Sequence, residues 1–414
     1  MGIDIKLGLI FLSLMLINLL YTLIAVIYPV TAEDRGIPSW LVGMVFSSMA
    51  AISFPLSLWI GKNLSRIGRR KVITLGLLLA SVALLLLAFI VYLDNTWFLV
   101  MSFASRMVGG VAMAFVYTAG CAIITSDYQE KAQKYLPAAE FFAGIGLTIG
   151  PTLGAVAYHV LGFTGITLVA SVPFVLLTVL VGVFIKPSSS LETSSGKFEF
   201  SKLLKNPNII LDAVLITYMN ACITFLDPSL GPYLNSLGYS VNMIGVAFLM
   251  GCVGYCITCL VLAFTVHKLD VKLMQCISLL TCSLMMALVP PWHEVSGHST
   301  VLTFAALASV GVALACPFSG TMPAMTEIAE SRGFKNTDQL QDAISGIFAF
   351  AFSMGDIAGP LTSGFLVHLV GFENAMLVMS GLGLALSCVY IPFSVRFKLV
   401  SRKKSNYISL EETK

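Results

Sequence analysis

Long apolar runs, separated by short polar stretches, are the feature that most constrains the fold of this 414-residue chain. A helix that crosses a bilayer needs about 20 consecutive apolar residues, and runs of that length recur from one end of the sequence to the other. Of all residues 57% are hydrophobic and 11% are charged. A soluble fold could not hide so much apolar surface, because its exterior must be wetted. The sequence therefore predicts an all-α integral membrane protein.

Twelve of the apolar runs are long enough to span a membrane. Polar residues separate each run from the next, and an even number of spans places both chain ends on one side. The predicted spans are residues 7–30, 40–61, 72–93, 97–125, 136–161, 165–185, 208–234, 240–266, 271–290, 301–325, 342–370 and 375–395.

The basic residues predict the orientation of these spans. Of the 24 Lys and Arg residues, 22 fall on the side that holds both termini. Arg35 lies in a loop on the opposite side, and Arg106 lies within a span. Cytoplasmic loops carry an excess of Lys and Arg. We therefore expect both termini in the cytosol.

A charged, Ser-rich loop in the middle of the chain divides the spans six and six. We interpret this loop as a cytosolic linker between two halves. The predicted division is an N-terminal half at 1–185, the linker at 186–207, a C-terminal half at 208–395 and a basic cytosolic tail at 396–414.

The two halves repeat in sequence. Residues 146–163 match residues 355–372, since both segments read G-x-x-x-G-P and then H-x-x-G-F. Parallel six-helix repeats are one known transporter architecture, and they place a binding cavity between the halves. The repeat therefore favours alternating access over a continuous pore.

The loop after the second span is similar to the major facilitator signature G-x-x-x-D-R-x-G-R-R. It reads Gly61-x-x-x-Ser65-Arg66-x-Gly68-Arg69-Arg70. Glycine permits a tight turn, and basic residues are expected at a cytosolic helix end. In the family the acidic residue belongs to a charge latch between helices, and here Ser65 replaces it. A plain positively charged loop is the alternative interpretation.

The repeated segment of the fifth span resembles the antiporter motif of the same family. It carries Gly150 and Pro151, and Gly359 and Pro360 occupy the matching positions of the eleventh span. Small residues let helix backbones approach closely, and proline bends a helix by removing a hydrogen bond. The resemblance implies an exchanger, whereas ordinary small-residue packing remains the alternative.

Four charged residues are predicted deep inside spans: Arg106, Glu140, Asp227 and Asp356. A charge at the bilayer centre costs at least about 2.5 kcal/mol, so it usually faces a cavity or a partner. Three acids against one base leave a negative interior that attracts cations, and apolar surroundings favour reversible protonation of a carboxylate. The alternative is structural pairing, for instance of Arg106 with Glu140.

Other polar residues of the spans are weaker candidates. Tyr28, Tyr218 and Asn220 could add aromatic and polar contacts to a bound cation, because aromatic faces attract ammonium groups. Ordinary packing is the alternative for each of the three. Asp212 lies near the cytosolic end of the seventh span, where we expect exposure at the membrane interface.

Together these motifs resemble the vesicular amine transporter family of the major facilitator superfamily, over nearly the whole chain. The most specific likeness is Phe225-Leu-Asp227-Pro228-Ser-Leu230, supported by residues 28–46, 140–154, 323–334 and 355–372. Members of this family exchange lumenal protons for cytosolic amines. The resemblance therefore implies a proton-coupled amine antiporter.

The resemblance is closest to the polyamine branch of that family. Monoamine-transporting relatives carry aspartates where Ile17, Phe318 and Ala349 stand in this chain. Relatives of the polyamine branch also lack those acids and carry one at the position of Glu140. This implies that the substrates are polyamines such as spermidine and spermine.

The predicted function is proton-coupled import of organic cations, polyamines above all, into acidic secretory or endolysosomal vesicles. Two alternatives stay open. One is a plasma-membrane drug or organic-anion exporter of the same fold, which Arg106 favours, and the other is a non-transporting membrane scaffold. No catalytic triad, paired-histidine motif or phosphate loop stands out, so we expect no enzyme, no cofactor and no metal site.

The expected partners are the organic cation, protons and the lipid bilayer, with the protein as a monomer. The net charge of +3 is too small to predict binding to nucleic acid. The tail segment Tyr407-Ile-Ser-Leu410 fits the short tyrosine-based pattern that clathrin adaptors bind.

Overall fold

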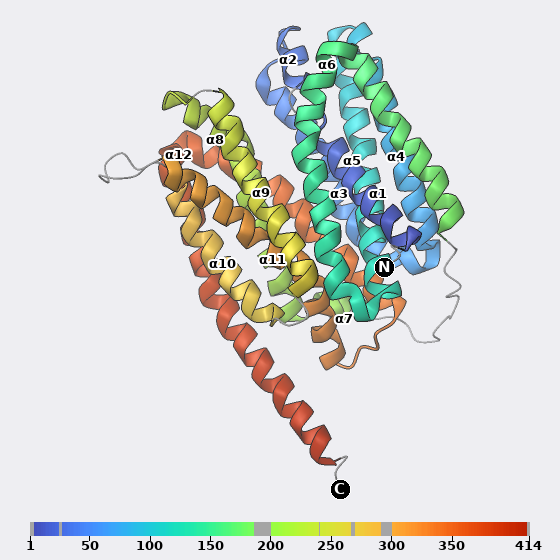
Figure 1. The fold of residues 1–414 in the computed structure, drawn as a ribbon, viewed down its shortest axis with the longest axis vertical. Coiled ribbons are helices and arrows are strands. Elements are labelled where there is room, and N and C mark those ends of the chain that lie inside the picture. The colour runs from blue at the N-terminus through green and yellow to red at the C-terminus, as the bar shows by residue number, and fades with distance from the viewer. Residues whose placement is uncertain are drawn as a thin grey trace.

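The computed structural model describes residues 4–24, 27–185, 200–239, 241–265, 270–290 and 300–411, and within these ranges all long elements are helices (Figure 1). Two short 3₁₀ turns, Ile90–Tyr92 and Gln129–Lys131, lie at loops. The helices are α1 (Ile5–Thr22), α2 (Ile27–Glu33), α3 (Ser39–Ile67), α4 (Arg69–Ala88), α5 (Asn95–Asp127), α6 (Ala132–Phe184), α7 (Phe200–Leu204), α8 (Pro207–Ser236), α9 (Val241–Thr265), α10 (Val271–Leu288), α11 (Thr300–Ser331) and α12 (Asp338–Glu411).

Two helices are longer than one span, and each turns at a glycine. The 53-residue α6 turns at Gly162, with φ 65°, and the 74-residue α12 turns at Gly371, with φ 79°. Positive φ suits glycine because it has no Cβ. The loops expected between spans 5 and 6 and between spans 11 and 12 are therefore single kinks. Ten helical segments of the described residues have the length and hydropathy to cross a membrane, so this is a multi-pass, all-helical membrane protein.

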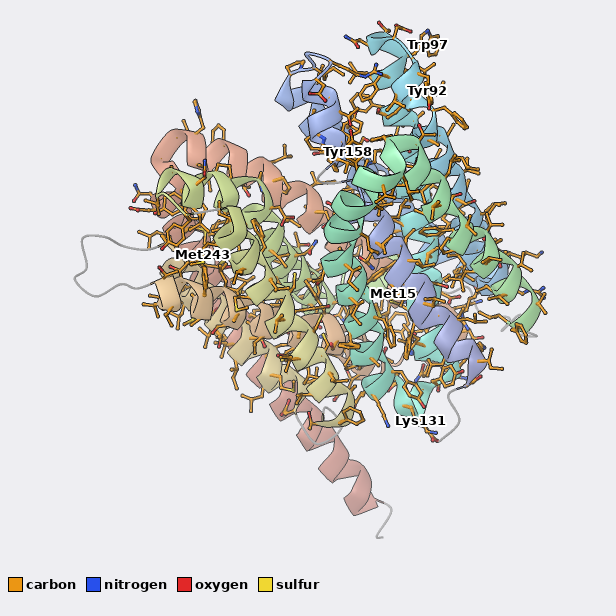
Figure 2. All side chains as sticks on the ribbon, turned by 45° about the horizontal axis from the view of Figure 1, so that its top comes forward. Met15, Tyr92, Trp97, Lys131, Tyr158 and Met243 are labelled. Atoms are coloured by element: carbon orange, nitrogen blue, oxygen red, sulfur yellow. The ribbon has the colours of Figure 1, made fainter. Side chains whose placement is uncertain are left out.

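The helices form two groups, as Figure 1 shows. Helices α1 to α6 lie together, coloured blue to green, and α8 to α12 lie beside them, coloured yellow to red. Both chain ends lie toward the same end of the bundle, which we call the terminal face. Figure 2 shows Lys131 at this face and Tyr92 and Trp97 at the other end, which we call the opposite face. Exposed aromatic residues of this kind are typical of a membrane–water interface.

In each helix group, a glycine of the repeated G-x-x-x-G-P segment packs closely against the first long helix of that group. A Cβ added at Gly150 would lie 2.0 Å from Thr22 Oγ1, and one added at Gly359 would lie 2.0 Å from Thr224 Oγ1. Helix α6 thus packs backbone to backbone on α1, and α12 packs in the same way on α8. The sequence repeat is therefore also a repeat of packing.

The two groups meet where α3 crosses α12 near the terminal face. A Cβ added at Gly61 would lie 2.5 Å from the Cα of Gly346, so the two backbones touch. Farther into the bundle, Ser53 Oγ lies 3.0 Å from Ser353 Oγ. These contacts close the bundle at its terminal face, whereas the groups diverge toward the opposite face (Figure 1).

Candidate functional site

An ionic latch lies at the closed terminal face. Arg69 begins α4, and its Nε lies 2.6 Å from Asp342 Oδ1 while its Nη2 donates to the Asp338 carbonyl at 3.0 Å. Ser126 Oγ donates to Asp338 Oδ1 at 2.8 Å. Arg69 is only 4% exposed, so this network is largely shielded from water. The acid that Ser65 does not supply therefore comes from α12, in the other helix group.

The rest of the loop motif has simpler roles. Gly68 has a φ of 95° and makes the turn between α3 and α4. Arg66 is exposed and forms no ion pair among the described residues. Gly61 lets α3 approach α12 closely. Gly68 thus makes the turn, and Gly61 makes the close helix contact.

Glu140 lies buried between the two helix groups. Its Oε1 accepts a hydrogen bond from Tyr117 of α5 at 2.5 Å, and its Oε2 accepts one from Tyr255 of α9 at 2.7 Å. The side chain is 5% exposed. Tyr117 belongs to the same group as Glu140, but Tyr255 belongs to the other group. The carboxylate therefore links the two halves of the bundle.

The expected pair of Arg106 with Glu140 is wrong for this conformation. Arg106 lies eleven residues before Tyr117 on α5, about 16 Å along the helix axis at a rise of 1.5 Å per residue. Its Nη1 instead donates to the Tyr21 carbonyl at 3.4 Å, and its guanidinium lies 4.6 Å from the centre of the Phe46 ring. Arg106 Nε and Nη2 are buried and have no hydrogen-bond partner in the described part of the chain.

Asp356 and Asn220 form a polar pair across α12 and α8. The Asn220 Nδ2 donates to Asp356 Oδ1 at 2.7 Å and to the Phe352 carbonyl at 2.8 Å. Asn220 is 2% exposed, and Asp356 is half-buried. The amide therefore fixes the position of the Asp356 carboxylate between α8 and α12.

Asp227 is an exposed acid in the membrane-spanning part of α8. It forms no hydrogen bond or ion pair with any residue that the structure describes. It is in electrostatic range of Asp356, and Tyr21 of α1 is in range of both acids and of Arg106. Because Tyr21 belongs to the other helix group, Asp227 lies near the boundary between the groups. Three of the four predicted membrane charges thus surround one tyrosine.

The two candidate tyrosines are packing residues in this conformation. Tyr28 is fully buried and stacks on Phe98 with ring centres 5.5 Å apart. Tyr218 donates its hydroxyl hydrogen bond to the Met379 carbonyl at 3.0 Å, in the second arm of α12. Neither contact involves the membrane carboxylates.

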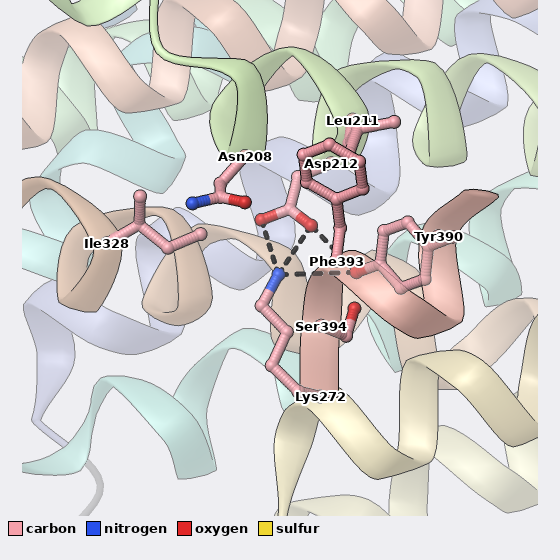
Figure 3. Close-up of a pocket in the computed structure, with 8 residues that line it drawn as sticks. All are labelled: Asn208, Leu211, Asp212, Lys272, Ile328, Tyr390, Phe393 and Ser394. Atoms are coloured by element: carbon pink, nitrogen blue, oxygen red, sulfur yellow. Dashed lines mark hydrogen bonds and ion pairs between the residues drawn. The ribbon is translucent and has the colours of Figure 1, made fainter. Parts of the chain in front are cut away.

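Asp212 is fully buried, so the expectation of an exposed interfacial residue is wrong. The Lys272 Nζ lies 2.5 Å from Asp212 Oδ1, and the Tyr390 hydroxyl donates to the same oxygen at 2.7 Å (Figure 3). The partners stand 60 and 178 residues away in sequence, on α10 and α12. The pocket here holds about 10 Å³, roughly the volume that one water needs. We therefore infer that this network has a structural role and does not bind substrate.

Sequence reasoning missed five residues of these networks. Tyr21, Tyr117 and Tyr255 count as apolar in a hydropathy profile, although each carries a hydroxyl group. Asp338 stands just before a predicted span and Asp342 begins it, so both look like ordinary acids of a span end. Tyr117 and Tyr255 lie in other predicted spans than Glu140, so no pattern within one span would have found them.

Some predicted residues cannot be judged at side-chain level. Pro151 lies in α6 and Tyr407–Leu410 in α12, but the placement of these side chains lies outside what the structure describes. Pro360 lies within α12, next to Gly359. Of the predicted linker, residues 186–199 lie outside the described ranges.

Two helix groups built on the same packing repeat, with charged residues inside the membrane-spanning part, have the architecture of membrane transporters made of parallel repeats. A solved structure, that of the human organic anion transporter MFSD10 (TETRAN), matches this fold with a TM-score of 0.76 at 17% identity. The match covers 94% of this chain and 100% of that chain, and at this identity it shows the fold alone.

The sequence profile of the Major Facilitator Superfamily matches residues 10–336. The chain belongs to this superfamily, so it is a transporter and not an enzyme.

Similar proteins indicate which branch of the superfamily the chain is related to. The chain is 28% identical to the MFS-type transporter SLC18B1 of Mus musculus, over 89% of this chain and 81% of that protein. It is 25% identical to the chromaffin granule amine transporter of Homo sapiens, over 85% of this chain and 64% of that protein. It is also 25% identical to the synaptic vesicular amine transporter of Rattus norvegicus, over 86% and 67%. The chain is thus related to SLC18B1 and to the vesicular amine transporters.

Proposed function

We propose that this protein is a proton-coupled antiporter that loads organic cations, polyamines such as spermidine and spermine, into acidic vesicles. The observation that carries the proposal is Asp227, an exposed carboxylate inside the membrane that has no partner in the described residues and lies in electrostatic range of Asp356. Two acids beside one open space attract a cation. The names of the vesicular relatives, which include amine transporters, support the same class of substrate.

The proposed orientation places the terminal face in the cytosol and the opposite face in the vesicle lumen. This orientation rests on the predicted topology, in which 22 of the 24 basic residues lie on the same side as the termini. In this orientation the described conformation is closed to the cytosol and open to the lumen. The tail, with Tyr407–Leu410, then lies in the cytosol, where a clathrin adaptor could bind it.

The proposed mechanism uses each acid in two protonation states. In the lumen-open conformation, protons neutralise Asp227 and Asp356, and the bound ammonium groups leave. In the cytosol-open conformation, the proton is lost and the carboxylates bind ammonium groups again. Because a site holds either protons or the cation, the two fluxes are coupled in opposite directions.

Glu140 adds a second, separated anion for an extended polyamine. With the cytosolic end closed, both of its oxygens accept hydrogen bonds from tyrosines. Parting of the two helix groups would remove Tyr255, since that residue lies on α9. One carboxylate oxygen would then be free to accept an ammonium hydrogen from the cytosolic side.

A second candidate function is export of an organic anion. It is favoured by Arg106, whose Nε and Nη2 are buried without partners in the described residues. A buried guanidinium with two free donors matches a carboxylate or phosphate group.

Transport by the purified protein in liposomes tests the proposal. An inside-acid pH gradient should drive uptake of labelled spermidine. Asp227→Asn should lower the uptake rate at least about tenfold, because the lost contact between the carboxylate and the ammonium group contributes more than about 1.4 kcal/mol. Asp34→Asn, which removes an exposed acid outside the predicted spans, is the matched control and should transport normally. Unchanged uptake by Asp227→Asn, or gradient-driven uptake of an organic anion in place of spermidine, would contradict the proposal.

A further inference from the structure

Helices α8 and α12 contact each other on both sides of a groove, at Gly359 and again at Tyr233. They are in backbone contact where Gly359 meets Thr224. Beyond that point α8 contains Pro228 and Pro232, and α12 contains Pro360. Each proline removes one helix hydrogen bond and favours a bend. The two helices enclose a groove of about 400 Å³ there.

The walls of this groove combine aromatic and polar groups. Tyr233 stacks on Phe372 with ring centres 4.2 Å apart, and its hydroxyl donates to Glu373 Oε1 at 2.6 Å. Ser363 lines the groove and is 1% exposed, yet its Oγ has no hydrogen-bond partner among the described residues. A buried hydroxyl without a partner is costly. A ligand that donates a hydrogen bond here would remove that cost.

Two residues that line the groove, Pro228 and Tyr233, each neighbour an acid. Pro228 directly follows Asp227 in sequence. Tyr233, with its partner Glu373, lies six residues farther along α8, about 9 Å at the rise of an α-helix. The groove is also lined by Pro232 and by the face of α12 that carries Ser363 and His368.

We propose that this groove is a lumenal binding site for the second ammonium group of a linear polyamine. Asp227 holds one terminal ammonium, and Glu373 holds the other. An extended triamine can span the distance between them, with Ser363 accepting a hydrogen bond from the chain nitrogen. The rings of Tyr233 and Phe372 add cation–π attraction for the outer ammonium group. The inference rests on the proposed function and deepens it, since it predicts that a polyamine binds better than a monoamine.

The test compares two amines of similar length in the liposome assay. Glu373→Gln should raise the KM for spermidine about tenfold, the loss expected for one charge-assisted contact. It should leave the KM for heptylamine, a linear monoamine, unchanged, because a single ammonium group needs only Asp227. The control is Glu330→Gln, an exposed acid near the terminal face, which should leave both values unchanged. An equal change for both amines, or no change for either, would overturn the inference.

A second variant guards against misfolding of the first. Gly364→Cys, at an exposed groove position where an added Cβ meets open space, should react with a positively charged thiol reagent added from the lumenal side, and spermine should protect it while heptylamine should not. Equal protection by both amines, or by neither, counts against the groove as a polyamine site. If the wild-type protein transports neither amine, the proposed function itself fails. If it transports both amines but Glu373→Gln leaves their KM ratio unchanged, only the groove assignment fails.

Discussion

Glu140 is the residue through which the two helix groups share a buried charge. Its carboxylate accepts one hydrogen bond from within its own group and one from the other group. Hydropathy and sequence position identify Glu140 and Asp227 as unusual, because a charge inside a span is costly. They do not show that one acid is enclosed by tyrosines and the other exposed, because the partners lie far away in sequence.

Tyr255→Phe should shift the protein toward a conformation that is open at the terminal face. The substitution removes the hydrogen bond that crosses between the groups, and a hydrogen bond to a charged group contributes about 1.5–3 kcal/mol, or at least roughly tenfold in an equilibrium. Pulsed EPR between spin labels at Arg66 and Arg332, exposed residues of the two groups near the terminal face, would measure the shift.

Tyr117→Phe is the matched control for this prediction. It also removes one hydrogen bond to Glu140, but its bond lies within one helix group and survives when the groups part. An equal shift of the label distance in both variants would show that Glu140 does not act as a link between the halves.

At the scale of elements, α6 and α12 are built alike. Each begins with a span that packs through glycines on the first helix of its group, and each turns at a glycine of positive φ into the next span. The sequence repeat predicts this correspondence, since the glycines recur at matching positions. It does not predict that a single glycine with non-helical backbone angles makes each turn, because these short loops look like the others in sequence.

Gly359→Ala should destabilise the packing of α12 on α8. The added Cβ would lie 2.0 Å from Thr224 Oγ1 and 2.7 Å from the Ala221 carbonyl, so the helices must shift. Overpacking of this kind costs about 1–3 kcal/mol. The thermal unfolding temperature in detergent should therefore fall.

Gly381→Ala tests the same substitution in the other arm of α12, where the added Cβ meets open space. Alanine favours a helix over glycine by about 1 kcal/mol. The control should keep or raise the unfolding temperature. A fall as large as that of Gly359→Ala would mean that close approach of the backbones is not the cause.

At the scale of the whole molecule, the protein is closed at its terminal face by the Gly61–Gly346 contact, the Arg69 latch and the Glu140 link. Each of these three contacts joins one helix group to the other. The residues involved lie on α3, α4, α5, α6, α9 and α12. In the sequence, Ser65 stands where the family's charge latch carries its acid. The structure supplies Asp342 and Asp338 from the other helix group instead.

Gly346→Val should prevent closure of the terminal face. The Cβ alone would lie 2.6 Å from the Cα of Gly61 and 2.8 Å from the Ser57 carbonyl, which are backbone atoms that cannot rotate away. We expect longer EPR distances between Arg66 and Arg332, and spermidine uptake at least about tenfold slower, since each transport cycle must pass through the closed state.

Gly43→Ala, on the same helix α3 but in open space, should leave both the distance and the uptake unchanged. Normal uptake by Gly346→Val would show that transport does not require this helix contact.

The sequence by itself determined the all-helical membrane class, the repeat and the presence of acids inside the apolar spans. It could do so because the costs of burying charge and of exposing apolar surface act on each residue locally. Tertiary structure alone decided the partners: Lys272 for Asp212, two tyrosines for Glu140, Asp342 for Arg69, and open space for Asp227. These contacts join helices far apart in the chain, and their energies depend on distances of a few ångströms that periodicity does not encode.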